Sequence, residues 1–120
     1  VVRSLKSLEG RSFRNGARVV VQDVDYALID FETQILTAID TDVMVGAHGA
    51  GLLHNIFMPD RAALVELFID SSQANRHFHN FAKWQGHKYF SRPMLNPIPT
   101  SELIKLVTQA IDSIDLSKPY

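Results

Sequence analysis

The sequence predicts an α/β fold, a Rossmann-like parallel sheet with helices on both faces. Short apolar runs alternate along the chain with segments that carry apolar residues at helical spacing. The runs are apolar on both faces, as expected for strands that helices cover from two sides. One run ends in a turn with three glycines, at residues 46–51, before a helical pattern resumes. These observations define the fold class, and the last also predicts a ligand site.

Length and composition fit one globular domain over residues 1–120, with 46% hydrophobic and 21% charged residues. Twelve basic and thirteen acidic residues give a formal charge of -1, which argues against a general nucleic-acid or anionic-membrane surface. The chain has no cysteine, so disulfides, thiolate catalysis and cysteine zinc sites are excluded. No apolar run approaches membrane-spanning length, so we expect no direct membrane contact. The chain lacks an initiator methionine, and we expect it to be a fragment or a processed product.

The first part of the chain predicts two helices and two strands. Residues 1–14 carry apolar residues at helical spacing and predict a helix. The β-branched run within Ala17–Asp23 predicts a buried strand. Asp30 can cap a helix that runs to about Ile39, and Val43–Gly46 predicts the next strand. The helix after this cap places four apolar residues on one face: Phe31, Ile35, Leu36 and Ile39.

The second part continues the alternation. Leu52–Phe57 predicts a short helix that stops before Pro59. Ala63–Ile69 predicts a third strand, apolar except at Glu66. Three further elements are expected: a helix capped by Ser71 or Ser72 and ended by Gly86, a short strand at Lys88–Phe90, and a helix that starts at Thr100 or Ser101.

In such a fold the loops that follow the strands share one edge of the sheet, where ligands bind. The Gly46–Gly51 loop, the Asp70–Ser72 turn and the turn after Val24 should therefore lie together. Exposed amides in a strand-to-helix loop suit an anionic ligand such as phosphate. The alternative is a tight turn in which His48 only caps or packs.

Glu66 is a lone carboxylate in an apolar strand, so it should either face the ligand edge or find a hydrogen-bond donor. Its functional interpretation is acceptance of two ribose hydroxyls, and the alternative is a position open to water. Ser71 and Ser72 could donate to a phosphate or simply cap a helix. His77 and His79 are two residues apart on a predicted helix, which disfavours a shared metal, and we expect no metal site.

The glycine-rich turn matches neither common nucleotide motif. The dinucleotide fingerprint would need a glycine where His54 stands, and we expect that histidine to pack. No Gly-Lys-Ser/Thr follows, so the turn is not a Walker loop. His48–Gly51 resembles the oxyanion loop of some esterases, but the Gly-x-Ser-x-Gly elbow that should follow is absent.

Six short motifs occur in order between about residues 30 and 90. They are Phe31-Glu32-Thr33-Gln34-Ile35, Thr41-Asp42-Val43-Met44-Val45-Gly46, Ala47-His48-Gly49-Ala50-Gly51-Leu52, the segment Asn55 to Pro59, Val65-Glu66-Leu67 and Gly86-His87-Lys88-Tyr89. As an ordered set, they resemble glycosyltransferase family 61.

The resemblance implies an inverting, nucleotide-sugar-dependent transferase of the GT-B type, with this chain as its donor-binding half. The implied donor-binding residues are Gly46, His48, Gly49, Ala50, Gly51, Glu66, Ser71 and Ser72. The implied partners are a UDP-linked sugar donor, a protein or glycan acceptor and the N-terminal half of the enzyme, with no metal required. The general base is expected in that other half, with His48 as the candidate here, so the chain alone should be incomplete for catalysis. The alternatives are a non-catalytic α/β binding or assembly module and an esterase-like hydrolase, and the compartment stays open.

Overall fold

The computed structural model describes residues 2–47, 50–68, 77–93 and 99–117. Within these residues three strands form one parallel sheet in the order β1-β2-β3. The elements, in chain order, are α1 (Val2–Lys6), the 3-10 helix η1 (Tyr26–Leu28), α2 (Phe31–Ile39), β1 (Val43–Ala47), the 3-10 helix η2 (Ala50–Phe57), β2 (Ala63–Phe68), α3 (His77–Gln85), β3 (Lys88–Pro93) and α4 (Thr100–Asp112).

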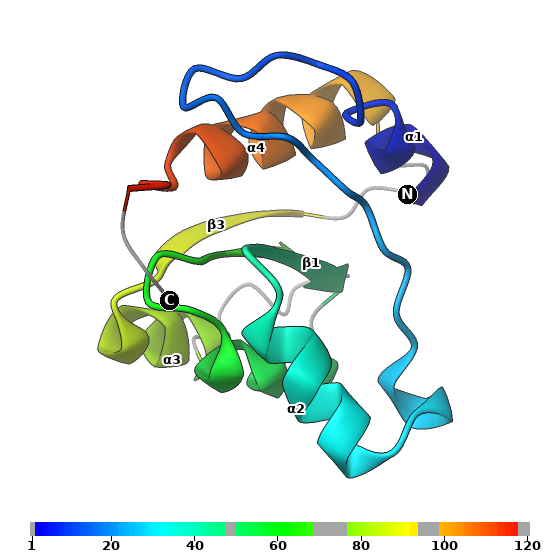
Figure 1. The fold of residues 1–120 in the computed structure, drawn as a ribbon, viewed down its shortest axis with the longest axis vertical. Coiled ribbons are helices and arrows are strands. Elements are labelled where there is room, and N and C mark those ends of the chain that lie inside the picture. Colours follow the sequence, from blue (N-terminus) through cyan, green and yellow to red (C-terminus); the bar gives the residue numbers. More distant parts are fainter. Residues whose placement is uncertain (1, 48–49, 69–76, 94–98, 118–120) are drawn as a thin grey trace.

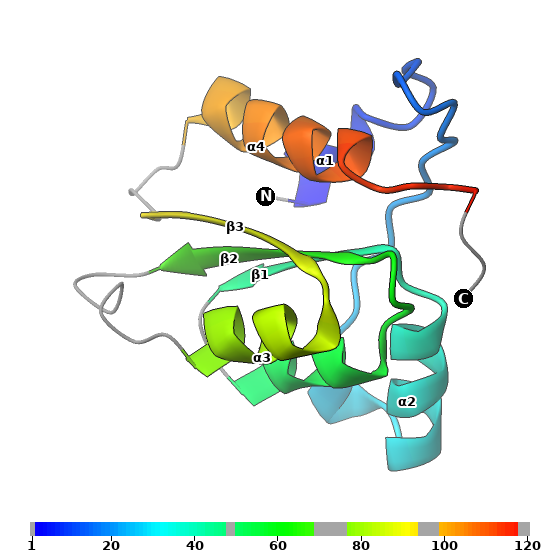
Figure 2. The same cartoon turned by 90° about the vertical axis from the view of Figure 1, so that its left-hand side faces the viewer.

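Helices cover both faces of the sheet, which confirms the predicted α/β class. Figure 2 shows α1 and α4 on one side of the strands and α2 and α3 on the other. Every residue of β2 is buried, and successive residues point to opposite faces. Ala63, Val65 and Leu67 pack against α1 and α4, whereas Leu64 packs against η2 and α3. A strand between two helical layers needs apolar residues on both faces, which explains why β2 shows no alternation.

Several predicted element boundaries are confirmed. The carboxylate of Asp30 accepts a hydrogen bond from the Thr33 backbone N–H at 2.8 Å and caps α2. Gly86 follows α3 with a φ of 77°, the left-handed conformation that glycine adopts most readily. The last helix starts at Thr100 as expected, with Pro99 in the N-cap position.

The predicted strand at Ala17–Asp23 is wrong in this structure. The segment is extended, and its side chains alternate between half-buried and exposed, but it belongs to no strand of the described sheet. The backbone groups of Val21 are instead bound by side chains near α1. Its N–H donates to Glu9 Oε2 at 2.7 Å, and its carbonyl accepts from Lys6 Nζ at 2.8 Å. In Figure 1 the segment runs in blue from the α1 and α4 layer past β1 towards α2.

Four other expectations are corrected or fall outside the described residues. The first helix is short, because α1 ends at Lys6 and turns follow. The helix after the glycine-rich turn forms, but as a 3-10 helix. The predicted apolar face of α2 is only partly covered, with Phe31 67% and Leu36 58% exposed. The caps expected from Ser71 and Ser72 lie outside the described residues.

Candidate functional site

The parallel sheet brings to one edge the ends of the two strands that precede the predicted ligand-binding segments. β1 ends at Ala47 and β2 ends at Phe68, and parallel strands end at the same edge of a sheet. Gly46 lies in register with Glu66, directly beside it on the neighbouring strand. His48, Gly49, Ser71 and Ser72 are outside the described residues, so their positions relative to this pair remain predictions.

Gly46 allows η2 to approach β1 closely. A Cβ atom at this position would lie 2.9 Å from Cδ2 of Leu52, which is closer than carbon atoms normally pack. Leu52 is itself buried in the core between β1 and α3. The glycine therefore suits this close contact, because a Cβ atom here would force the end of the Leu52 side chain to move.

Glu66 has found a donor inside the protein. Its side chain is fully buried, and the Tyr89 hydroxyl donates to its Oε1 at 2.5 Å. Tyr89 also stacks on the His79 ring from α3, with ring centroids 4.4 Å apart and planes 7° apart. The interpretation of Glu66 as a strand position open to water is therefore wrong. A buried carboxylate held by a phenol O–H is instead a fixed acceptor beside Gly46.

The start of η2 is held by a network around His54. The His54 ring stacks on Tyr26 of η1, with centroids 4.0 Å apart, which confirms that this histidine packs. Its Nδ1 lies 2.9 Å from the Gly51 carbonyl, and its Nε2 lies 3.0 Å from Gln34 Oε1. The turn after Val24 therefore does reach the segment that follows β1, through Tyr26. The Gly51 end of the predicted loop is fixed by aromatic and amide groups from two earlier elements.

Gln34 connects α2 to this network. Its side-chain amide donates to the carbonyls of Tyr26 and Ile29, at 2.8 Å and 3.1 Å. Because two carbonyls need the amide N–H groups, the Gln34 oxygen must be the atom that faces His54. Gln34 belongs to the motif Phe31–Ile35, and through His54 its side chain supports η2, the helix that begins within the motif Ala47–Leu52.

Two buried polar side chains on this side of the sheet were not predicted. Asn55 is fully buried in η2, and its side-chain amide has no hydrogen-bond partner among the described residues. His87 is also buried, and this burial lowers the pKa of its imidazole below the usual value. Neither could be found from spacing, because an asparagine in an amphipathic helix and an isolated histidine are typical of a protein surface.

The sequence contained a signal for Tyr89 that residue-by-residue reasoning missed. Tyr89 lies three residues after Gly86, which ends α3, so it falls in the next strand beside β2. A tyrosine on a strand adjacent to a buried carboxylate is a natural donor.

Among the described residues no group of three or more His, Cys, Asp or Glu side chains is placed to bind a metal ion. None of the helices described is both long and apolar enough to cross a membrane.

The comparisons with known proteins point to one class, the glycosyltransferases. In particular, the chain is similar to proteins named EGF domain-specific O-linked N-acetylglucosamine transferase. It is 33% identical over 69 residues to the Drosophila melanogaster protein, covering 58% of this chain and 13% of that relative. It is 36% identical over 73 residues to the Mus musculus protein, covering 61% of this chain and 14% of the relative. No family model matches the chain, and no solved structure gives a significant match. The matches therefore span about one seventh of the length of these relatives.

Proposed function

We propose that the chain is part of a glycosyltransferase of family 61 and forms its donor-binding, Rossmann-like half. The names of the relatives and the six ordered motifs support this proposal. The parallel sheet is compatible with it, because nucleotides bind at the carboxyl ends of such strands. The complete transfer reaction belongs to a longer protein, since the matched relatives are about seven times longer than the matched segment.

The observation that carries the proposal is the position of Glu66 beside Gly46 near the carboxyl ends of β2 and β1. The segments that follow these two strands contain His48 and the Gly49–Gly51 amides on one side and Ser71 and Ser72 on the other. We propose that these groups bind the diphosphate of a UDP-linked sugar. Amide and hydroxyl donors suit phosphate oxygens, so a divalent metal is not required.

Glu66 has a specific role in this proposal. The Glu66 carboxylate is fully buried and already accepts from Tyr89. A ribose must therefore enter the protein as far as this carboxylate to bind it. We propose that ribose hydroxyls replace the Tyr89 hydroxyl as donors to this carboxylate. Tyr89 then holds Glu66 in place until the nucleotide arrives, and it competes with the ribose rather than binding it.

The reaction would be inverting transfer. An acceptor hydroxyl on a protein or glycan attacks the anomeric carbon, and the UDP group leaves with its bonding electrons. The loop amides and His48 would stabilise the charge on the leaving diphosphate. Each hydrogen bond to a charged group contributes about 1.5–3 kcal/mol. The general base would come from the other half of the enzyme, with His48 as the alternative in this chain.

Calorimetric titration with UDP and UDP-N-acetylglucosamine, with and without chelator, tests this assignment. His48→Ala and Glu66→Ala should each weaken binding by roughly one to two orders of magnitude. Tyr89→Phe should leave the affinity unchanged or raise it, because the phenol is a competitor. Glu32→Ala, at an exposed position on α2, is the matched control for loss of a carboxylate. Unchanged affinity in both site variants, with the fold intact, would contradict the site assignment.

One observation favours a second candidate, a non-catalytic assembly module. α2 exposes Phe31, Leu36 and Ile39 by 67%, 58% and 46%, and apolar side chains gathered on one helix are typical of a protein–protein contact. A module of this kind would bind no nucleotide, so the same titration distinguishes it from the donor-binding half. The esterase-like alternative would be removed by a serine-reactive probe that labels nothing.

A further inference from the structure

The most unusual surface of this fold is the outer edge of β1. β1 is an edge strand of the sheet, and no described strand pairs with its outer side. A cavity of about 680 Å³ lies beside it. The walls of this cavity include Val43 and Val45 of β1, Val107 and Ile111 of α4, and residues 17–24. An edge strand with unpaired N–H and C=O groups is a template for another strand.

The segment that forms the far wall has the character of such a strand. In Ala17–Asp23 half-buried and exposed residues alternate with the period of two that strands show. Ala17, Val19 and Val21 pack against the same core cluster as Val43 and Val45. Val20 points the other way and is 73% exposed, an unfavourable state for a β-branched apolar side chain.

The chain order also suits pairing with β1. Both crossovers within the sheet, through η2 and through α3, pass over the same face. α2 connects Ala17–Asp23 to β1 and lies on that same face, as Figure 2 shows. A strand on the outer side of β1 would therefore be joined to it by a crossover of the same hand as the other two.

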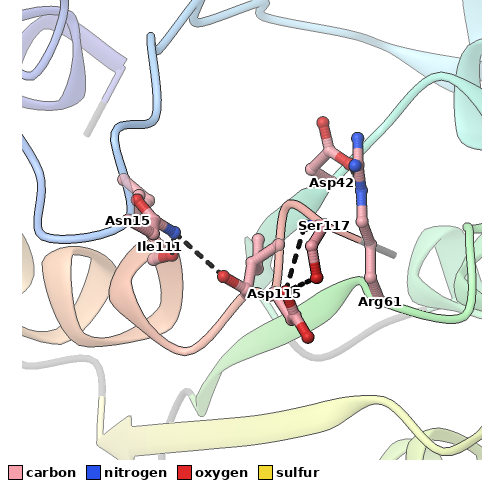
Figure 3. Close-up of polar contacts among 7 residues, drawn as sticks. Asn15, Asp42, Arg61, Ile111, Asp115 and Ser117 are labelled. Atoms are coloured by element: carbon pink, nitrogen blue, oxygen red, sulfur yellow. Dashed lines mark hydrogen bonds and ion pairs between the residues drawn. The ribbon is translucent and has the colours of Figure 1, made fainter. Parts of the chain in front are cut away.

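The contacts that hold the segment away from β1 are few and exposed. The Val21 backbone is bound by Lys6 and Glu9, whose side chains are 51% and 36% exposed and lie 3.7 Å apart. At the other end of the cavity wall, Asn15 donates to the carbonyls of Ile111 and Ile114, at 2.8 Å and 3.0 Å (Figure 3). The exposed contacts of Lys6 and Glu9 with Val21 contribute little to stability. The partly buried hydrogen bonds of Asn15 instead fix the start of the segment to the end of α4.

We propose that residues 17–23 form a mobile strap with two positions. In the position described here, Lys6 and Glu9 hold its backbone. In the second position it lies against β1 as a fourth parallel strand, closes the cavity and buries Val20 on the α2 side of the sheet. This proposal concerns the fold alone and does not depend on the proposed nucleotide site.

Amide exchange and nuclear Overhauser contacts, measured by NMR on the full chain, test the proposal. The variant Lys6→Met/Glu9→Met removes the bonds to Val21, because neither methionine side chain offers the donor or the acceptor that is lost. In this variant we expect amide protection to rise at least about tenfold in Val43–Val45 and Val19–Val21, because hydrogen-bonded amides exchange only on opening. Backbone contacts between these two segments should appear at the same time.

Two further variants make the result decisive. Arg92→Met/Glu102→Gln removes a different ion pair, whose atoms lie 2.7 Å apart, and should leave both segments unchanged. Adding Val20→Asp to the released variant should reverse the protection, because the strap can close only by burying residue 20. If the first variant disturbs α1, Glu9→Met alone gives the same test, because it removes the acceptor of the Val21 N–H. Absence of both protection and backbone contacts after release, or protection that survives Val20→Asp, would overturn the proposal.

Discussion

Replacing Tyr89 with phenylalanine removes one hydroxyl and leaves the ring that stacks on His79. The lost bond runs from this hydroxyl to Glu66 Oε1 over 2.5 Å, and the carboxylate is fully buried. A hydrogen bond to a carboxylate contributes about 1.5–3 kcal/mol. We therefore expect Tyr89→Phe to lower the free energy of unfolding by about 2 kcal/mol.

Urea denaturation followed by tryptophan fluorescence measures this change, with Trp84 as the chain's one tryptophan. Tyr26→Phe is the matched control, because it removes the same atom from a half-buried tyrosine that is stacked on a histidine. No hydrogen bond of the Tyr26 hydroxyl to a described residue is found, so its loss should change stability by less than about 0.5 kcal/mol. Glu66→Gln keeps an acceptor for Tyr89 and should be less destabilising than Glu66→Ala. Equal effects of the two Tyr→Phe changes would refute the reasoning.

Three further predictions concern neighbouring contacts. Gly46→Ala should destabilise the fold by about 1 kcal/mol, the lower end for overpacking, because the new Cβ meets a movable Leu52 methyl group at 2.9 Å. Gly51→Ala should be nearly neutral in the same urea titration, because its nearest atom would be 3.8 Å away, and equal losses would contradict this difference. Gln34→Leu should cost about 1–3 kcal/mol in thermal unfolding, since two backbone carbonyls lose their donor, and an unchanged midpoint would rule this out. Burial lowers the pKa of His87 in the folded chain, so the unfolded chain binds its proton first as pH falls below about 6.5. Stability should therefore fall with decreasing pH from that point down to the folded pKa, and His87→Gln should flatten this slope, whereas parallel curves would argue against it.

The sequence was sufficient for the parallel core of the fold. The strands predicted at Val43–Gly46, at Ala63–Ile69 up to its last described residue Phe68, and at Lys88–Phe90 all form, because short apolar runs between helical patterns are typical of buried parallel strands. The Asp30 cap and Gly86 were equally predictable, because each residue supplies a local hydrogen bond or a left-handed backbone that the helix end requires.

The errors arose where a local pattern depended on a distant partner. The β-branched run at Ala17–Asp23 has strand character, but the Lys6 and Glu9 side chains bind the Val21 backbone, and no described strand pairs with it. Helical periodicity placed Phe31 on an apolar face but could not show that nothing described in this chain covers it. The spacing of residues in a sequence identifies which face of a helix is apolar. Only the folded structure shows which other residues cover that face.

The candidate site could be predicted only in part, because some of its contacts also join residues that lie far apart in the sequence. The need of Glu66 for a donor was clear, because an unpaired carboxylate cannot remain in an apolar strand. The identity of that donor was not, since Tyr89 lies 23 residues away and reaches Glu66 only through the order of the strands. The contacts of Tyr26 and Gln34 that support η2 could not be predicted either, because ring stacking and side-chain amide hydrogen bonds produce no periodic pattern in the sequence.

An NMR titration of the chain with UDP, in the presence of chelator, tests most directly whether this chain holds the nucleotide of a sugar donor. We expect saturable shifts of the amides of Gly46, Gly51 and Glu66, with none on the outer side of α4 at Lys105 and Gln109. No shift at the three site amides in a folded sample, or shifts confined to α4, would contradict the assignment of a donor site to this chain.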